Sequence, residues 1–234
     1  MEGFDTKVFL IMCSIIASFD KNKIKELAAL NSYRGQHSYS ITVFERHTFD
    51  VIYQSKGFGP LIVDNHNFVA EGAYIVAHQQ APTTDNKDID SIHPAQIEHH
   101  MLWHNGIIKN KSVKELQQRL KSNTTWDTKL ILQQLISIDN VDNIDGTFSC
   151  VWFNGTNLIA FRNDISPLFI DSKLNISSTK FEGSNSVLSN TMWLIDTSLS
   201  QEQLHTPKGL YPIKSFETVE NPYYFSEMRH ECEH

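Results

Sequence analysis

The chain has 234 residues, a formal net charge of −7 and 40% hydrophobic residues, which suits one large folded domain or two small ones. An acidic chain lacks the clustered excess of Lys and Arg that nucleic-acid binding requires. No apolar run approaches the roughly 20 residues that span a bilayer. We therefore expect neither a nucleic-acid partner nor a membrane span.

The cysteines are too few and too scattered for a disulfide framework, which favours a reducing, cytoplasmic setting. Residues 8–17 are apolar like the core of a secretory signal, but the segment before them is acidic, and signals have a basic start. A buried strand is the better interpretation. The three cysteines are Cys13, Cys150 and Cys232.

The first part of the chain predicts a strand, a helix and a hairpin. Residues 6–19 are apolar and β-branched, as in a strand that is buried on both faces. Asp20 is a good N-cap for the helical pattern that follows. Residues 39–44 and 49–53 alternate in polarity around a short polar turn, which predicts the hairpin. The helix residues expected to face inward are Ile24, Leu27, Ala28 and Leu30.

The rest of the chain predicts a mobile loop, two adjacent helices and more strands. Residues 80–95 are polar and carry two prolines, which predicts the loop. Ser112 and Glu115 have the capping-box spacing of a helix start, and a second helix begins near Trp126. The inward residues expected on the two helices are Leu116, Leu120, Leu130, Ile131, Leu135 and Ile136. The further strands expected are 73–78, 100–104, 147–153, 157–162 and 167–170. This order favours an α+β layered fold over a regular βαβ repeat.

Short segments in a fixed order carry a resemblance to a known family. The segments are MCSIIASFD at 12–20, RGQHS at 34–38, AHQQAPT at 77–83, HNGIIKN at 104–110 and WDTK at 126–129. With these spacings the chain resembles a class II glutamine amidotransferase domain, and among these it is most similar to the glutaminase domain of asparagine synthetase. The later segments 145–152, 162–169 and 207–211 resemble the strands and the closing Pro-Pro-Gly stretch of that family.

The resemblance implies a fold and a domain layout. The fold would be the four-layer αββα sandwich of N-terminal-nucleophile hydrolases, which is an α+β fold. The domain would cover 13–222. Residues 1–12 would be a leader, a propeptide or a strand extension, and 223–234 would be a polar tail.

The resemblance also implies a site without a cofactor. Cys13 would be the nucleophile, and its own α-amine, with a reference pKa of about 7.7–8.0, would be the base. The Asn105 side chain and the Gly106 N–H would hold the oxyanion. Asp127 would hold the substrate ammonium, although an acid here also suits a helix N-cap or first turn. The alternative for Asn105-Gly106 is a tight turn, which is the usual meaning of Asn-Gly. The residues implied around the substrate are Asp127, Gln80, His78 and Arg34, the last of which is expected to brace a turn over the site.

Two features depart from the family pattern. Gln80 stands where the family has an arginine that binds the α-carboxylate with two hydrogen bonds, and losing a charged partner costs on the order of 1.5–3 kcal/mol. Glutamine then binds weakly, another basic residue substitutes, or the ligand lacks that carboxylate. Twelve residues also precede Cys13 and, if they stay attached, remove its amine. They are a cleaved propeptide, they precede a true start at Met12, or the domain is a retired enzyme.

The sequence therefore predicts a glutaminase that releases ammonia for a separate ATP-dependent synthetase or ligase. The alternatives are a catalytically retired interaction module and a hydrolase of a different amide. Four histidines invite a zinc hypothesis, but His99 and His100 would point to opposite faces of a strand, and no Cys or carboxylate completes the spacing. We expect no metal site, and we expect Cys150 to be inert core. The four histidines are His93, His99, His100 and His104.

Overall fold

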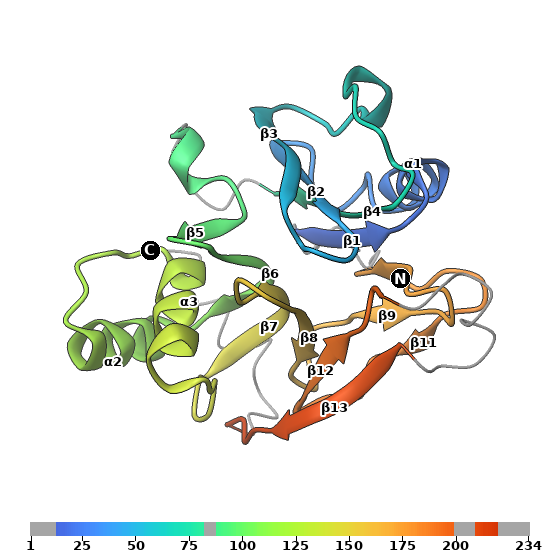
Figure 1. The fold of residues 1–234 in the computed structure, drawn as a ribbon. Coiled ribbons are helices and arrows are strands. Elements are labelled where there is room, and N and C mark those ends of the chain that lie inside the picture. The colour runs from blue at the N-terminus through green and yellow to red at the C-terminus, as the bar shows by residue number, and fades with distance from the viewer. Residues whose placement is uncertain (1–12, 82–87, 199–208, 220–234) are drawn as a thin grey trace, which may run out of the picture.

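The computed structural model describes residues 13–81, 88–198 and 209–219, and the strands in these residues form two antiparallel sheets (Figure 1). The strands of the first sheet are β1 Ser14–Ser18, β2 Ser38–Glu45, β3 Val51–Phe58, β4 Ala73–Gln80, β9 Phe169–Ile170, β10 Ile176–Ser177 and β11 Asn185–Ser186. The strands of the second sheet are β5 Ala95–Ile97, β6 His100–Ile108, β7 Gly146–Phe153, β8 Leu158–Arg162, β12 Thr191–Ile195 and β13 Leu210–Ser215. Their order is β11-β9-β10-β1-β4-β2-β3 in the first sheet and β13-β12-β8-β7-β6-β5 in the second.

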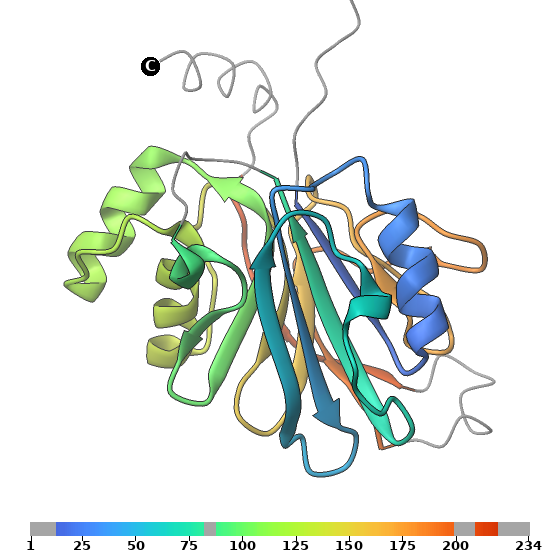
Figure 2. The ribbon, with the colours of Figure 1, turned by 90° about the horizontal axis from the view of Figure 1, so that it is seen from above.

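Helices cover the outer faces of the two sheets. The described helices are α1 Lys21–Leu30, α2 Asn110–Leu120 and α3 Asp127–Ile138, with short 3-10 turns η1 Val63–Asn65 and η2 Ile89–Ser91. Figure 2 shows α1 on one side of the sheets and the helix pair on the other. None of these helices, in the part of the chain described, is long and apolar enough to cross a membrane. The α+β class expected from the sequence is confirmed.

The apolar interior divides into three clusters that follow this arrangement. Between the sheets, Phe44 of β2 meets Trp103 of β6 and Phe153 of β7, with ring centroids 6.2 Å and 4.9 Å away. One outer cluster joins α1 to β1, β2 and β4, and the other joins α2 and α3 to β6, β7 and β8. Side chains of β1 alternate between two clusters, because Ile15 faces the second sheet and Ile16 faces α1. The first strand is thus buried on both faces, as its composition predicts.

Helix α1 follows the prediction except at its end. The Asp20 carboxylate accepts a hydrogen bond from the Asn22 backbone N–H at 2.8 Å, which confirms the cap. Leu30 is 37% exposed, contrary to expectation. The buried stripe runs at helical spacing from Leu27 to Asn31, and Leu30 lies beside it. Ile24, Leu27 and Ala28 are buried as expected.

Helices α2 and α3 correct two sequence expectations. Helix α2 begins at Asn110, so Ser112 lies within the first turn of this helix and not at its N-cap. The Ser112 hydroxyl instead accepts a hydrogen bond from the Asp145 N–H at 2.9 Å and anchors the chain entering β7. Ile136 is 40% exposed because it follows Leu135, which occupies the buried face.

The segment predicted as a mobile loop contributes buried residues after the undescribed stretch 82–87. Ile92 and His93 are buried, and Ala95 begins β5. The Lys56 ammonium donates to the carbonyls of Ile92 at 2.7 Å and Pro94 at 2.9 Å. The mobile-loop prediction is therefore wrong for this part, since tertiary hydrogen bonds fix it. The hairpin of β2 and β3 and strands β4, β6, β7, β8 and β9 are confirmed, whereas β5 and the short or late strands β10 to β13 were not predicted.

Candidate active site

Cys13 lies directly before β1 at one end of the first sheet and is 7% exposed. In the antiparallel register, Ser14 pairs with Gln79 and Ile15 with His78. The next position along this register places Cys13 opposite Gln80, on the face that Ile15 turns toward the second sheet.

Burial raises the pKa of the Cys13 thiol to about 11. A hydrogen bond from the Ala81 backbone N–H lowers this pKa, the negative charge of Asp127 raises it, and the positive charge of Arg34 lowers it. These interactions locate the thiol among Ala81, Asp127 and Arg34. A thiol with this pKa is almost entirely protonated at neutral pH, so an additional base is needed for nucleophilic attack.

The turn after α1 is fitted against the segment beside the thiol. The Arg34 Nε donates to the Cys13 carbonyl oxygen at 3.0 Å, as a bracing role predicts. A Cβ at Gly35 would lie 2.5 Å from the carbonyl carbon of Gln80 and 2.7 Å from the Ala81 nitrogen. Only glycine therefore permits the turn to pack so closely on Gln80 and Ala81.

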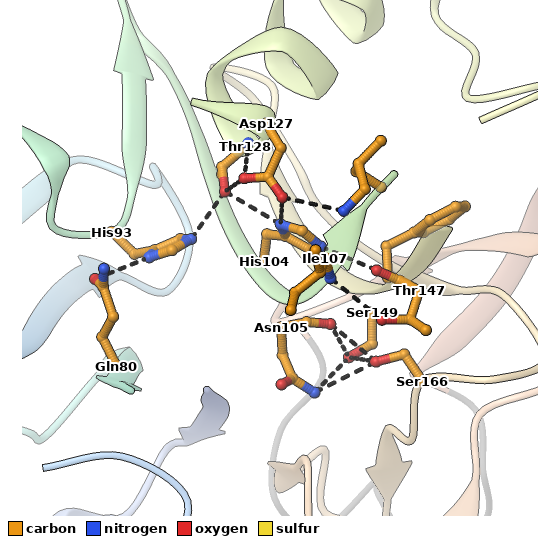
Figure 3. Close-up of polar contacts among 12 residues, drawn as sticks. Gln80, His93, His104, Asn105, Ile107, Asp127, Thr128, Thr147, Ser149 and Ser166 are labelled. Carbon is orange, nitrogen blue, oxygen red and sulfur yellow. Dashed lines mark hydrogen bonds and ion pairs between the residues drawn. The ribbon is translucent and has the colours of Figure 1, made fainter. Parts of the chain in front are cut away.

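Asn105 and Gly106 lie inside β6, so the tight-turn interpretation of Asn-Gly is wrong here. The Asn105 Nδ2 donates to Ser149 Oγ at 3.2 Å and to Ser166 Oγ at 3.4 Å, while its Oδ1 is buried with no partner among the described residues (Figure 3). Gly106 has φ +150, and a Cβ there would lie 2.0 Å from the Thr147 carbonyl oxygen. The backbone at this point therefore requires glycine.

Asp127 is the first residue of α3, and Trp126 is the N-cap, so the first-turn interpretation of this acid is confirmed. Its Oδ1 accepts from the Thr128 N–H at 2.7 Å, and its Oδ2 accepts from the Ile108 N–H at 3.2 Å. The carboxylate thus joins the start of α3 to the end of β6. A helix N-terminus favours negative charge at this position.

Buried histidines and Thr128 form a polar chain from Gln80 on β4 to His104 on β6. The His93 Nδ1 lies 3.2 Å from Gln80 Oε1, and its Nε2 lies 3.0 Å from Thr128 Oγ1. Thr128 Oγ1 also lies 3.1 Å from His104 Nδ1, so the polar chain continues from β4 to β6, as Figure 3 shows. The His78 ring stacks on His93 with centroids 4.0 Å apart. Its Nε2 bonds the His104 carbonyl oxygen at 3.0 Å.

Burial lowers the pKa of His78 to about 3 and lowers the pKa of His93 well below its usual value. In His78 the hydrogen bond to the His104 carbonyl opposes this effect, and the neighbouring His104 and Lys56 add to it. In His93 the nearby His78, His104 and Lys56 add to it. Both rings are therefore neutral at physiological pH.

The structure brings together residues that the motifs indicated and others that they did not. The thiol of Cys13 interacts with Asp127, Arg34 and the segment after Gln80, and His78 bonds the backbone of β6 beside Asn105. The residues missed from the sequence are His93, Thr128, Ser149 and Ser166. A weak signal existed for Thr128, Ser149 and Ser166, which stand within family-like segments, whereas His93 was noted only as one of the four histidines considered for zinc.

The zinc hypothesis concerned His93, His99, His100 and His104. Among the described residues, no three His, Cys, Asp or Glu side chains gather in an arrangement that could hold a metal ion. The expectation that His99 and His100 point to opposite faces of a strand is wrong. His99 lies in the turn before β6, and the two ring centroids are 4.4 Å apart. Cys150 is fully buried and unpaired, as expected for a core residue, and Cys232 lies outside the described residues.

Comparison with solved structures identifies the fold. Glutamine phosphoribosylpyrophosphate amidotransferase from B. subtilis, complexed with ADP and GMP, matches 87% of this chain with a TM-score of 0.56 and 14% identity. The chain has the fold of a glutamine amidotransferase domain. The structure of the allosteric regulatory enzyme of purine biosynthesis matches with the same TM-score, identity and coverage. A class-II glutamine aminotransferase domain protein from Silicibacter pomeroyi matches more weakly, over 88% of this chain with a TM-score of 0.45 and 8% identity.

The likeness concerns the fold and only part of the matched proteins. The chain spans 48% of the length of each of the first two. No protein-family model and no curated protein matches the sequence. The resemblance to class II glutamine amidotransferases expected from the motifs is thus confirmed in the fold.

Proposed function

We propose that this chain is a glutaminase of the class II glutamine amidotransferase type, with Cys13 as the nucleophile. The observation that carries the proposal is the position of Cys13. Its buried thiol lies at the end of β1, within electrostatic reach of Asp127 at the start of α3. The helices on the two outer faces support the finer assignment of a four-layer αββα sandwich. We assign residues 13–222 to this domain.

The proposed reaction is hydrolysis of a side-chain carboxamide in two steps. The Cys13 thiol gives its proton to a base as its sulfur attacks the amide carbon. The C–N bond then breaks, and the base passes this proton to the leaving nitrogen, which departs as ammonia. Water then attacks the resulting thioester, which yields the carboxylate and restores the thiol. Each tetrahedral intermediate carries an oxyanion that needs hydrogen-bond donors.

Asn105 and the Gly106 N–H are the proposed oxyanion donors. In the structure the Asn105 Nδ2 is directed to two serine hydroxyls, and Oδ1 is the unpartnered atom. A half-turn of the amide exchanges these atoms. The Ser149 hydroxyl can then donate to Oδ1 while the Ser166 hydroxyl keeps its bond to the Asn105 carbonyl oxygen at 2.8 Å, which frees Nδ2 for the oxyanion. The serine pair therefore suits an amide that presents its nitrogen to a substrate.

The base must come from outside the described side chains around the thiol. Burial lowers the pKa of His78 and His93, so both rings are weak bases, and it raises the pKa of the Cys13 thiol to about 11. An α-amine on Cys13, with a reference pKa of about 7.7–8.0, would supply the base. The proposal therefore requires removal of residues 1–12, by cleavage of a propeptide or by a start at Met12 followed by loss of Met.

Ammonia released by an isolated glutaminase is lost, so the proposal includes a partner. The acceptor would be bound by a separate ATP-dependent synthetase or ligase in the cytoplasm.

Covalent labelling of two chain forms tests the proposal. We expect a chain that begins at Cys13 to react with the glutamine-like diazoketone 6-diazo-5-oxo-norleucine and to release ammonia from its substrate, and we expect the unprocessed chain to do neither. Intact mass and peptide mapping locate the label, and Cys150→Ser serves as the matched control that should still react. Equal labelling and hydrolysis by both forms would refute the N-terminal-nucleophile mechanism.

A second candidate is a non-catalytic module that keeps the fold. Two observations favour it: Cys13 has a strongly raised thiol pKa, and Gln80 is hydrogen-bonded to His93. Under this alternative neither chain form reacts with the diazoketone. The same labelling experiment therefore separates the two functions.

A further inference from the structure

A row of uncharged polar side chains lies beside Cys13 on the face of the first sheet that meets the second. Ser38 pairs with Gln80, and Ser40 pairs with His78, in the register of β2 and β4. Directly paired residues share a face, and His78 reaches the second sheet through its bond to the His104 carbonyl. We call Ser38, Ser40, His78 and Gln80 the polar row.

The polar row contains buried atoms that lack hydrogen-bond partners. The hydroxyls of Ser38 and Ser40 and the Nδ1 of His78 have none among the described residues, and each of these residues is at most 1% exposed. Buried polar groups in folded proteins are nearly always paired, so a ligand or water is expected to complete these. Because a carbonyl only accepts, His78 Nε2 carries the proton. The neutral ring therefore presents Nδ1 as an acceptor.

The proton order of the histidine chain makes Gln80 an acceptor as well. His104 Nε2 lies 3.3 Å from the Thr147 carbonyl oxygen, which only accepts, so this nitrogen carries a proton. The Thr128 hydroxyl has acceptors for its own proton in Asp127 Oδ1 at 3.3 Å and His104 Nδ1 at 3.1 Å. Thr128 Oγ1 must then accept from His93 Nε2, which leaves His93 Nδ1 to accept from Gln80. A half-turn of the Gln80 amide, which places Nε2 instead of Oε1 beside His93 Nδ1, lets the amide donate there through its nitrogen. Its oxygen is then free as an acceptor.

One acid and two cations lie near the polar row, and both cations already donate to backbone carbonyls. The negative charge of Asp127 acts on the Cys13 thiol itself. The Lys56 ammonium is held by two carbonyls, and burial lowers its pKa to about 8, against the nearby charge of Asp90. The Arg34 Nε is held by the Cys13 carbonyl, whereas its buried Nη2 lacks a partner among the described residues. Arg34 is therefore the cation that a carboxylate would have to use.

A carboxylate only accepts hydrogen bonds, whereas the polar row offers acceptors at Gln80 and His78. From this mismatch we infer that the site takes a glutaminyl amide, in which the α-carboxyl group is part of an uncharged amide, in preference to free L-glutamine. The amide N–H donates to the polar row, and the amide carbonyl accepts from a serine hydroxyl. The inference rests on the proposed function for the side-chain amide that Cys13 attacks.

Binding to the full chain carrying Cys13→Ala separates recognition from hydrolysis. Isothermal titration with L-glutamine, L-glutaminamide and L-glutaminyl-glycine measures the preference, and isoglutamine is the control that lacks the side-chain amide. We expect both glutaminyl amides to bind roughly tenfold or more tightly than L-glutamine, and isoglutamine to bind weakly. The same order should hold in the parent chain for protection of Cys13 against alkylation.

Substitution of Gln80 tests which group sets the preference. Gln80→Arg should reverse the order in favour of L-glutamine, while the same change at the exposed Gln118 on α2 should leave it unchanged. Equal or tighter binding of L-glutamine by Cys13→Ala, or binding of no ligand, would overturn the inference. If L-glutamine is preferred and Arg34→Gln removes that preference, Arg34 is the carboxylate partner and the inference is wrong. A preference for the amides without ammonia release by the chain that begins at Cys13 would support the recognition and refute the proposed hydrolysis.

Discussion

The reactivity of the Cys13 thiol gives a quantitative test of the site. With a pKa of about 11, on the order of one thiol in 4,000 is ionised at pH 7.4. An unperturbed cysteine with a pKa of about 8.5 has roughly one in 14 ionised, which is about 300-fold more. A more basic thiolate is intrinsically more nucleophilic, and this recovers roughly tenfold over the same interval.

The unprocessed chain should therefore react with iodoacetamide at Cys13 about 20- to 30-fold more slowly than the same thiol in urea-unfolded protein at pH 7.4. The rate in the folded chain should rise about tenfold per pH unit from about pH 7 to 9.5, since the thiolate fraction does so. Peptide mass spectrometry after timed quenching measures each thiol separately. Restricted access to the buried sulfur can only increase the difference.

Two internal references make the result decisive. Cys150 is fully buried with a pKa raised by burial, so it should react no faster than Cys13. Cys232→Ser removes the remaining thiol from the measurement. A folded-state rate at Cys13 that levels off near pH 8, or that equals the rate in urea, would refute the environment described for this thiol.

Three further predictions concern the site and its histidines. Asn105→Ala should leave the fold intact and lower turnover of the processed enzyme by ~10²-fold or more, and unchanged steady-state rates would remove Asn105 from the oxyanion hole. Gly106→Ala should destabilise the protein by about 1–3 kcal/mol in urea unfolding, because its Cβ would lie 2.0 Å from the Thr147 oxygen; wild-type stability would contradict the strain. The folded state lowers the pKa values of His78 and His93, so the unfolded chain binds more protons than the folded chain below about pH 6.5. The free energy of unfolding should therefore fall as pH falls below about 6.5, by about 1.4 kcal/mol per pH unit for each ring. Urea unfolding at about pH 7.5 and 5.5 measures this loss, and a pH-independent midpoint would refute it.

The fold could be predicted from the sequence where local pattern and burial agree. Residues 39–44 and 49–53 alternate in polarity and form the β2–β3 hairpin, although the polar side chains of β2 are buried as well as the apolar ones. Strands β10 and β11 have two residues each, which is too short for any periodicity to show. The expectation for Ser112 failed because its hydroxyl bonds a residue 33 positions away, which local spacing cannot reveal.

Some residues of the candidate site could be predicted from the sequence, and others could not. Cys13, Asn105, Gly106 and Asp127 stand in short segments whose order is readable in the sequence. The role of His93 comes from tertiary contacts: it lies between Gln80 and Thr128, residues 13 and 35 positions away in the chain. The segment that carries it is polar and aperiodic, so local reasoning predicts a mobile loop there.

The fold and the chemical state of residue 13 make separate contributions to activity. The fold supplies position: Arg34 holds the Cys13 carbonyl, the Ala81 N–H approaches the sulfur, and Asn105 lies on a strand of the facing sheet. It does not supply ionisation, because burial and the charge of Asp127 both keep the thiol protonated. An amine on the same residue would accept the thiol proton without any rearrangement of these contacts. Under the proposed function, removal of the preceding residues would therefore activate a site that is already assembled, and the folded unprocessed chain would lack glutaminase activity.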